Sequence, residues 1–423
     1  MKNMKLCAIL IFAFITLTNA QWLETTIAVG ATPRALVYNP TNNKVYCANF
    51  YSDNVTVIDG ATNTVITTTG AGNGPWGLTY NPTNNKVYCA NWGSNDVTVI
   101  DGAADTIITT IAVGVRPRRM VYNPTNNKVY CANLDSDNVT VIDGATNAVI
   151  TTIAVGGRPY VLVYNPTHNK VYCANRNSDD VTVIDGAADT IITTIAVGSL
   201  PRALVYNPTH NKVYCANDGS DNVTVIDGAT NAVIDTIAVG NGPCTLVYNP
   251  TNDKVYCVNE SSANVTVIDG ATNAVITTIG FGDPYRMVYN ATNNKVYCAN
   301  YWGSTVTVID GAADTIIRTI PVGIEPCAFT WNYAQNRTYV ANYGSNNVSV
   351  IRDVTGIEED KTSIVESNDV GATIFSGPLQ LPKGKEWKVF DITGRVVEPD
   401  KIQPGIYFIE VDGMVTQKVV KVR

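Results

Sequence analysis

The sequence predicts an all-β protein, an eight-bladed β-propeller of four-stranded blades closed by its N-terminal strand, with a small C-terminal β-sandwich after it. Three observations lead to this prediction. A unit of about 42 residues recurs along most of the chain. Each unit holds four short apolar segments bounded by turn residues, and none has the 3.6-residue apolar spacing of an amphipathic helix. Four strands in a unit of this length are typical of a propeller blade.

The first residues predict a signal peptide over residues 1–20. Lys2 and Lys5 precede an apolar run, and small residues stand directly before Gln21. The run is too short to cross a bilayer as a stable helix, and no later stretch is long and apolar enough to form a transmembrane segment. We therefore expect an exported chain whose mature form begins at Gln21.

The repeat unit is clearest at residues 117–155. Its first two strands, Met120–Tyr122 and Lys128–Ala132, are separated by an Asn-Pro turn, in which Pro fixes φ and Asn accepts left-handed conformations. The third strand, Asn138–Ile142, alternates in the period-2 pattern of a pleated strand. Asp143 and the glycine after it then open a hairpin into the fourth strand.

The strand count predicts how the ring closes. Sets of first, second and third strands occur eight times, and so do fourth strands, but Trp22–Val29 is already a fourth strand and none follows Val348–Arg352. We expect the N-terminal strand to complete the last blade, because this removes both open edges. Residues 21–353 then form the propeller; a seven-bladed ring with one displaced unit is the alternative, which the matched count disfavours.

One stretch of the last repeat resembles a known family. Residues 338–351 read Thr-Tyr-Val-Ala-Asn-Tyr-Gly-Ser-Asn-Asn-Val-Ser-Val-Ile, which is similar to the YVTN-type propeller repeat of bacterial and archaeal surface proteins. The resemblance covers residues 22–352, although Cys usually replaces one Val of the motif. It implies an exported propeller with no shared catalytic residues.

The repeat stops near Val354, and residues 354–370 form a predicted polar linker. Residues 371–423 carry a second β pattern, with Thr-Gly-Arg at 393–395 and Pro-Gly-Ile-Tyr-Phe at 404–408. These elements resemble the C-terminal sorting domain of the type IX (Por) secretion pathway. The resemblance implies a small β-sandwich that the type IX secretion machinery recognises, with the chain then attached to the cell surface or released. An accessory β-domain that only packs or dimerises is the alternative.

The net charge of the chain excludes some classes of binding partner. A net charge of −7 argues against electrostatic binding of nucleic acid or anionic lipid.

The cysteines and the first-strand aromatic residues are expected in the core. Seven of the ten cysteines occupy one repeat position, where neighbouring copies should lie beyond the roughly 7 Å Cα limit of a disulfide, so we expect buried free thiols. These seven are Cys47, Cys89, Cys131, Cys173, Cys215, Cys257 and Cys298. First-strand rings are expected to form the inter-blade core: Tyr38, Tyr80, Tyr122, Tyr164, Tyr206, Tyr248 and Trp331.

Comparison of the repeats with one another predicts a ligand-binding face. The Asn-Pro-Thr turns and Asp-Gly hairpins are nearly identical and share one face of the disc, whereas the variable loops and the crossovers between blades share the other. Residues just after the crossover prolines should ring the channel mouth. The candidate ligand-binding residues are Arg34, Trp76, Arg118, Arg119, Tyr160, Arg202, Tyr285 and Arg286.

Guanidinium groups among aromatic rings suit a carboxylated or sulfated sugar, or an acidic peptide end, through bidentate hydrogen bonds and stacking. The alternative is that these side chains only stack on neighbouring blades and pair with loop carboxylates such as Asp53 and Asp137. In that case the ring of arginines and aromatic residues would have no ligand.

The sequence predicts no catalytic residue, no metal site and no cofactor. Its two histidines, His168 and His210, lie in the Asn-Pro-Thr turns. The chain therefore lacks the further histidine that a Ser/His/Asp or Cys/His nucleophile system or a His-rich metal cluster would need. Carboxylate pairs such as Asp135 and Asp137 remain candidates for a glycosidase site or a Ca²⁺ site. We rank a cell-surface binding or scaffold propeller for a glycan, acidic polymer or surface protein first. A surface-layer unit without a small ligand comes second, and a carboxylate-dependent hydrolase third.

Overall fold

The computed structural model describes residues 20–354, 372–375, 379, 387–391, 395–399, 401–411 and 414–421. Every regular element in these residues is a β-strand. The chain divides into two compact units, Met1–Ile357 and Glu358–Arg423. Apart from Ala20 and Val354, which belong to strands, the predicted signal peptide and linker lie outside the described residues.

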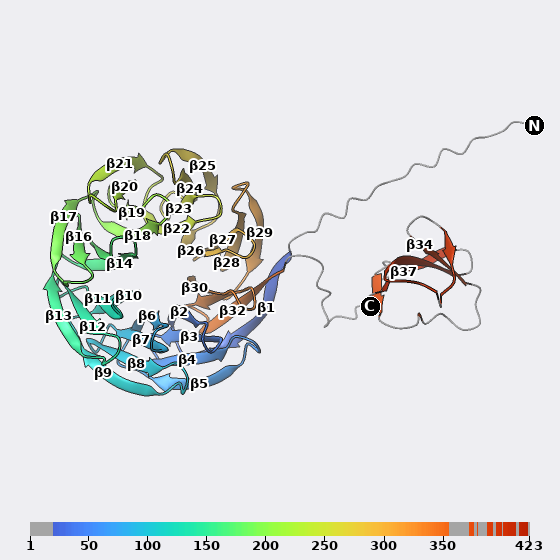
Figure 1. Cartoon of the computed structure of the whole chain (residues 1–423), viewed down its shortest axis with the longest axis horizontal. Helices are drawn as coiled ribbons and strands as arrows, with labels where there is room; N and C mark the ends of the chain where they lie inside the picture. Colours follow the sequence, from blue (N-terminus) through green and yellow to red (C-terminus); the bar gives the residue numbers. More distant parts are fainter. Residues whose placement is uncertain are drawn as a thin grey trace, which may run out of the picture. The chain divides into compact units, whose positions relative to one another are not determined.

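The first unit is an eight-bladed β-propeller of four-stranded antiparallel sheets, as the sequence predicted (Figure 1). Blades 1 to 8 are numbered here by their first strands: β2 (Pro33–Asn39), β6 (Pro75–Asn81), β10 (Pro117–Asn123), β14 (Pro159–Asn165), β18 (Pro201–Asn207), β22 (Pro243–Asn249), β26 (Pro284–Asn290) and β30 (Pro326–Asn332). The second strands are β3 (Lys44–Asn49), β7 (Lys86–Asn91), β11 (Lys128–Asn133), β15 (Lys170–Asn175), β19 (Lys212–Asn217), β23 (Lys254–Asn259), β27 (Lys295–Asn300) and β31 (Arg337–Asn342).

The third strands are β4 (Asn54–Asp59), β8 (Asp96–Asp101), β12 (Asn138–Asp143), β16 (Asp180–Asp185), β20 (Asn222–Asp227), β24 (Asn264–Asp269), β28 (Thr305–Asp310) and β32 (Asn347–Val354). The fourth strands are β5 (Val65–Gly70), β9 (Ile107–Ala112), β13 (Val149–Ala154), β17 (Ile191–Ala196), β21 (Val233–Ala238), β25 (Val275–Gly280), β29 (Ile316–Pro321) and, for blade 8, β1 (Ala20–Ala28). First strands surround the central channel and fourth strands form the circumference (Figure 1).

The N-terminal strand closes the ring. β1 pairs antiparallel with β32, so that blade 8 has the strand order β1-β32-β31-β30. Side chains reinforce this closure: Gln21 Nε2 donates to Asp353 Oδ1 at 3.1 Å, and Arg337 Nε donates to Glu24 Oε2 at 2.7 Å. The prediction that the N-terminal strand completes the last blade is confirmed.

A repeated polar bridge joins each blade to the next. The second-strand tyrosine is fully buried, and in blade 1 the Tyr46 hydroxyl donates to Asp105 Oδ1 in blade 2 at 2.6 Å. Lys44 Nζ reaches the other oxygen of the same carboxylate at 2.7 Å. In blade 2 the corresponding lysine, Lys86, meets the amide oxygen of Asn147 at 3.0 Å instead. Each bridge buries polar groups with their partners, as close packing between blades requires.

The first-strand tyrosines pack into the inter-blade core, as the sequence predicted, but the fully buried tyrosines are those of the second strands. Of the first-strand rings, Tyr38 and Tyr206 are buried, but Tyr80 and its equivalents in blades 3, 4 and 6 are only partly buried. The fully buried tyrosine is in the second strand, such as Tyr46, because that strand has a hydrogen-bonded neighbour on each side and a blade against each face. The partly buried first-strand hydroxyls instead bond to the preceding blade, as Tyr80 does to Thr41 at 2.6 Å.

The cysteines are buried free thiols, as the sequence predicted. All nine that the structure describes are buried and unpaired, and seven of them are completely buried in the second strands. In blade 1, Cys47 Sγ donates to Asn49 Oδ1 at 3.5 Å within its own strand. They act as small core residues.

Loop residues fix the start of the first strands in blades 1 to 6. Asp53 adopts a left-handed φ of 52°, and its Oδ1 accepts the backbone N–H of Gly74 at 2.8 Å in the crossover to blade 2. Asp137 does the same for the backbone N–H of Arg158 at 2.8 Å. These carboxylates are therefore turn residues that hold the crossovers in place, and neither pairs with a channel arginine.

The second unit contains one mixed five-stranded sheet in its described residues, in the order β33-β37-β36-β34-β35. Its strands are β33 (Ala372–Phe375), β34 (Trp387–Asp391), β35 (Val396–Val397), β36 (Gly405–Val411) and β37 (Met414–Lys421). β33 runs parallel to β37, and the other pairs are antiparallel. Val389, Ile402, Tyr407, Ile409 and Val419 form its core. No helix in the described parts of the chain is long and apolar enough to span a membrane.

Candidate functional site

The candidate residues lie at the inner ends of the first strands. Each first strand has a register shift directly after its crossover proline, as between Pro117 and Arg119 in β10. Such a bulge re-aims the residues around it. As a result Arg118 and Arg119 both line the channel, and so do Tyr285 and Arg286 in β26.

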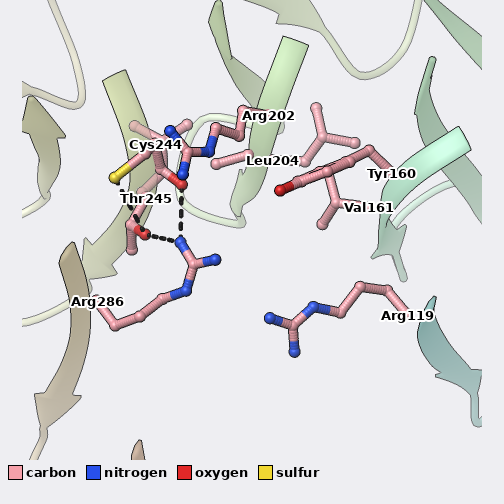
Figure 2. A pocket seen from close by; sticks show the side chains of 10 residues that line it. Arg119, Tyr160, Val161, Arg202, Leu204, Cys244, Thr245 and Arg286 are labelled. Atoms are coloured by element: carbon pink, nitrogen blue, oxygen red, sulfur yellow. Dashed lines mark hydrogen bonds between the residues drawn. The ribbon is translucent and has the colours of Figure 1, made fainter. Parts of the chain in front are cut away.

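The structure brings all eight sequence-predicted site residues together around two adjoining hollows of about 240 Å³ and 20 Å³. The larger is lined by Arg119, Tyr160, Val161, Arg202, Ala203, Leu204, Cys244, Thr245, Leu246 and Arg286 (Figure 2). The smaller is lined by Arg34, Trp76, Arg118, Arg119, Tyr285, Arg286 and Cys327. Five arginines therefore line the two hollows, and no described lining residue is an aspartate or glutamate.

Arg34 and Arg118 are held by aromatic rings. The Arg34 guanidinium carbon lies 4.2 Å from the Trp76 ring centre and 4.6 Å from that of Tyr343. Arg118 lies 3.5 Å above the Tyr160 ring and donates from Nη2 to the Tyr160 hydroxyl at 2.6 Å. The buried Nε atoms of both arginines lack a hydrogen-bond partner among the described residues. Cation–π stacking thus orients these guanidinium groups without neutralising them.

Among the described residues, Arg202 is the one arginine of the five with carboxylate partners. It forms ion pairs with Asp218 at 3.5 Å and with Glu260 at 2.8 Å. Burial opposes its charge, but its neighbours, these two carboxylates among them, raise the pKa of Arg202. Arg202 therefore fits the alternative in which channel arginines pair with loop carboxylates, although its partners are Asp218 and Glu260 rather than Asp53 and Asp137.

Arg119 and Arg286 face one another across the larger hollow (Figure 2). Arg286 Nη1 donates to the Cys244 carbonyl at 3.2 Å and to Thr245 Oγ1 at 2.7 Å, and its guanidinium stacks on Tyr285 at 4.3 Å. The Arg119 guanidinium forms no hydrogen bond or ion pair with any residue that the structure describes. Burial, followed by the charge of Arg286, lowers the pKa of Arg119.

Positive charge dominates the electrostatics of the site. Burial lowers the pKa of Arg118 to about 9, and the charges of Arg119 and Arg286 act in the same direction. Burial would raise the pKa of the Tyr160 hydroxyl, but Arg118, Arg286 and Arg202 together hold that pKa below its usual value. Shifts of this kind mark a partly dry site with too little negative charge.

An aromatic group borders the site on blades 1 and 2. Trp76 and Trp92 stack at 5.8 Å between ring centres, and Phe50 contacts Trp76 edge-on at 5.5 Å. Tyr51 packs against Phe50 and is 69 % exposed. We call Phe50, Tyr51, Trp76 and Trp92 the aromatic rim. Trp76 belongs both to the rim and to the smaller hollow, so the two are continuous.

Sequence reasoning placed the loops that carry Phe50, Tyr51 and Trp92 on the variable face but did not include them in the site. The signal that could have found them is that aromatic residues stand in the same variable loop of two consecutive blades. Blade 7 repeats the pattern: Tyr301 contacts Tyr285 at 5.2 Å, and Trp302 is 72 % exposed.

Other reactive groups near the channel have structural partners. Cys244 Sγ donates to the Tyr285 carbonyl at 3.3 Å and Cys327 Sγ to the Pro33 carbonyl at 3.2 Å. Burial raises the pKa of Cys244, and it raises that of Cys327 to about 11, so both thiols are protonated near neutral pH. Asp135, one of the carboxylates considered for hydrolysis, is bound by Arg116 at 2.6 Å.

The histidines lie away from the channel mouth, in the Asn-Pro-Thr turns. His210 Nε2 lies 2.7 Å from Asp253 Oδ2 of the next blade, and His168 Nδ1 lies 3.3 Å from Asn211 Nδ2. Within the described residues, no group of three or more His, Cys, Asp or Glu side chains is placed to hold a metal ion. The chemistry that this arrangement offers is recognition of anions by guanidinium groups next to aromatic surfaces.

Comparisons with known proteins agree with the fold. A family model described as YNCE-like beta-propeller matches residues 83–234. Kuenenia stuttgartiensis hydrazine synthase is similar in structure, with 18 % sequence identity and a TM-score of 0.56, over 78 % of this chain and 98 % of that one. Saccharomyces cerevisiae Sqt1 is similar with 11 % identity and a TM-score of 0.69, over the same shares. No curated protein matches the sequence.

At these identities the structural similarities establish the fold alone, because unrelated functions share propeller folds. The fold, the internal repeats and the family match together support a general binding or scaffold role. The chain is a β-propeller repeat protein.

Proposed function

We propose that the propeller is an exported cell-surface binding module whose channel mouth binds an acidic glycan, a polymer of sugars that carry carboxylate or sulfate groups. One observation carries this proposal. Five arginines line the two hollows without an aspartate or glutamate among the described lining residues, in a chain whose net charge is −7. A buried charge costs several kcal/mol unless it is paired. Arg202 already pairs with Asp218 and Glu260, and a bound anion would supply the carboxylate-like partner that the other four arginines lack among the described residues.

The size of the site favours a ligand that extends beyond it. The larger hollow, at about 240 Å³, is smaller than the roughly 300 to 1,000 Å³ of pockets that enclose a whole small molecule. It has room for one charged group of a larger ligand. The aromatic rim continues outward from Trp76 and offers exposed ring surface at Tyr51, against which the apolar faces of sugar rings can pack.

The proposal is tested by binding of the full chain to defined polymers at 150 mM salt, where surface charges are largely screened. We would compare polygalacturonate and dextran sulfate with neutral dextran and with poly-glutamate. We expect tight binding of the two acidic glycans, and loss of at least roughly tenfold in affinity for the Arg34→Ala/Arg118→Ala variant. Preference for poly-glutamate over both acidic glycans would indicate a peptide ligand instead and contradict the proposal.

A matched control separates the site from net charge. Arg158 is 46 % exposed in its side chain and pairs with Asp135, and Arg395 is exposed in the second unit. The Arg158→Ala/Arg395→Ala variant also removes two positive charges, but neither residue lines the two hollows. Equal loss of affinity in both variants would show non-specific attraction and overturn the proposed site. Arg34→Lys and Arg118→Lys should retain more affinity than the alanine variants if folding is intact.

We propose further that the signal peptide directs export and that the C-terminal unit is a sorting domain for the type IX secretion machinery. Support comes from the motifs at 393–395 and 404–408 and from a unit with its own apolar core around Val389 and Ile409. Fractionation of cells that express the full chain should find it at the cell surface or in the medium. A chain that lacks residues 371–423 should stay in the periplasm; surface delivery without these residues would contradict the assignment.

A second candidate function, a self-assembling surface scaffold, rests on the circumference of the propeller. The fourth strands of blades 1 to 7 each expose two consecutive β-branched residues, with exposures of 39 to 47 %. These residues are Val65, Ile66, Ile107, Ile108, Val149, Ile150, Ile191, Ile192, Val233, Ile234, Val275, Ile276, Ile316 and Ile317. Unpaired edges with apolar side chains invite association. Sedimentation that shows a monomer at all concentrations would reject this candidate.

A further inference from the structure

The innermost position of each blade, two residues after the crossover proline, differs among the eight blades in an orderly way. It holds Ala35, Gly77, Arg119, Val161, Ala203, Thr245, Arg286 and Ala328. Only blades 3 and 7 carry a charge there, and the other six residues are small. Blades 3 and 7 are four steps apart in a ring of eight, so they lie opposite one another.

The two arginines also lie at the same height in the channel. Arg119 is paired in register with Ala132, and Arg286 with Ala299, which occupy the same position of their second strands. Figure 2 shows the two guanidinium groups pointing toward one another across open space. Both residues line both hollows, so the space between them is where the hollows meet.

One arginine of the pair is anchored and the other is not. Thr245 Oγ1 and the Cys244 carbonyl accept hydrogen bonds from Nη1 of Arg286. The Arg119 guanidinium has no partner of its own among the described residues. Two like charges that face each other in a poorly solvated channel repel one another, and no described carboxylate lines the space to offset this repulsion.

We propose that Arg119 and Arg286 together bind one anionic group, a carboxylate, sulfate or phosphate, at the centre of the channel, so that it bridges blades 3 and 7. Each guanidinium can give two parallel N–H donors to such a group. The pair occurs once in the chain, so the stoichiometry is one. This inference rests on the proposed function in so far as the bridged group is the charged group of the glycan. The site itself requires only an anion.

Binding of this kind has a signature that a structural role for the arginines would not give. Without an anion, Arg119→Ala should raise the melting temperature, because the substitution removes like-charge repulsion and installs the residue that blades 1, 5 and 8 already hold at this position. With an anion, the wild-type chain should gain stability in a saturable manner that the variant lacks, because a ligand stabilises the state it binds. Arg286→Ala should lose the anion-dependent gain in the same way. Without an anion, however, it also removes the hydrogen bonds to Cys244 and Thr245, so only Arg119→Ala tests the rise in melting temperature.

The experiment uses the full chain and inorganic sulfate, titrated by calorimetry and by thermal unfolding against sodium chloride at matched ionic strength. We expect one sulfate per chain, and roughly tenfold to hundredfold weaker binding for Arg119→Ala and Arg286→Ala. Arg158→Ala removes a charge outside the channel and should bind as the wild type does. Sulfate also stabilises proteins non-specifically, so only the difference between the variants and Arg158→Ala counts.

The outcomes separate the anion pair from the glycan proposal. Unchanged sulfate binding by Arg119→Ala, more than one site per chain, or a melting temperature of Arg119→Ala that falls without anion would overturn the pair. If sulfate binds as expected but no acidic glycan does, the pair stands and the proposed function fails. If glycans bind through Arg34 and Arg118, and neither glycan nor sulfate binding changes in Arg119→Ala, the function stands and the pair fails.

Discussion

The closure of the ring makes a prediction whose size follows from the contacts of Asp353. This carboxylate is 1 % exposed and accepts hydrogen bonds from Gln21 Nε2 at 3.1 Å, Lys295 Nζ at 2.9 Å and the Tyr297 hydroxyl at 2.6 Å. It therefore ties the N-terminal strand β1 and blade 7 to the end of β32. Asp353→Ala would leave the Lys295 ammonium, 3 % exposed in its side chain, buried without its carboxylate.

Removal of one partner from a buried ion pair costs about 3 to 5 kcal/mol. The Tyr297 hydroxyl also loses its acceptor, but the two effects share one site and do not add. For a unit of about 330 residues, an unfolding entropy of about 2.1 cal/mol/K per residue gives about 1.4 °C per kcal/mol. Asp353→Ala should therefore lower the melting temperature by roughly 4 to 7 °C. Thermal unfolding followed by circular dichroism measures this shift.

Blade 4 supplies the matched control. Asp189 there accepts from Lys128 Nζ at 2.7 Å and from the Tyr130 hydroxyl at 2.6 Å, but it does not touch the closure. Its lysine side chain is 12 % exposed, and the equivalent Lys86 is satisfied by the amide of Asn147. Asp189→Asn should therefore cost less than about 1 kcal/mol. If Asp353→Ala costs no more than Asp189→Asn, the reasoning that Asp353 secures the closure is refuted.

Three further predictions concern the blade bridges, the hairpins and the rim. Asn147→Asp should stabilise the propeller by about 1 kcal/mol, because burial lowers the pKa of Lys86 and a carboxylate would favour its charged form; a lower melting temperature at pH 7 would contradict this. Hairpin carboxylates such as Asp59 have a lowered pKa, chiefly through the backbone N–H of Thr62. The unfolded carboxyl then binds protons more readily, so stability should fall as the pH drops below about 4, and a melting temperature unchanged from pH 6 to pH 3 would argue otherwise. Trp92→Ala should weaken acidic-glycan binding roughly tenfold but leave sulfate binding unchanged; equal effects on both ligands would remove the rim from the glycan site.

The sequence predicted the features that follow from the repeat pattern and from the number of repeats. The number of blades and their closure follow from counting strands, and the crossover prolines mark the inner end of each first strand, so the eight channel residues could be named. Contacts between blades were harder to predict. Arg202 is neutralised by Glu260 in the loop of the next blade, a pairing set by the rotation from blade to blade and by side-chain length. The stacking of Trp92 on Trp76 depends on the path of a variable loop, which repeat periodicity does not encode.

Because the repeats are nearly identical, the few positions at which they differ are the candidates for a function beyond folding. Blades of one sequence would build a channel with eightfold symmetry, in which every inner position carried the same side chain and no point was distinguished. The strand frame departs little from that symmetry, since the bridges from Lys44 to Asp105 and from Lys128 to Asp189 recur with the same geometry. Departures are concentrated at the crossovers and variable loops, where Arg119 and Arg286 stand on opposite blades and aromatic residues gather on blades 1 and 2. Packing can be satisfied by Ala at the innermost position, as it is in three blades. Two opposed arginines there add like-charge repulsion, so we infer that they serve the recognition of an anion and not the packing of the blades.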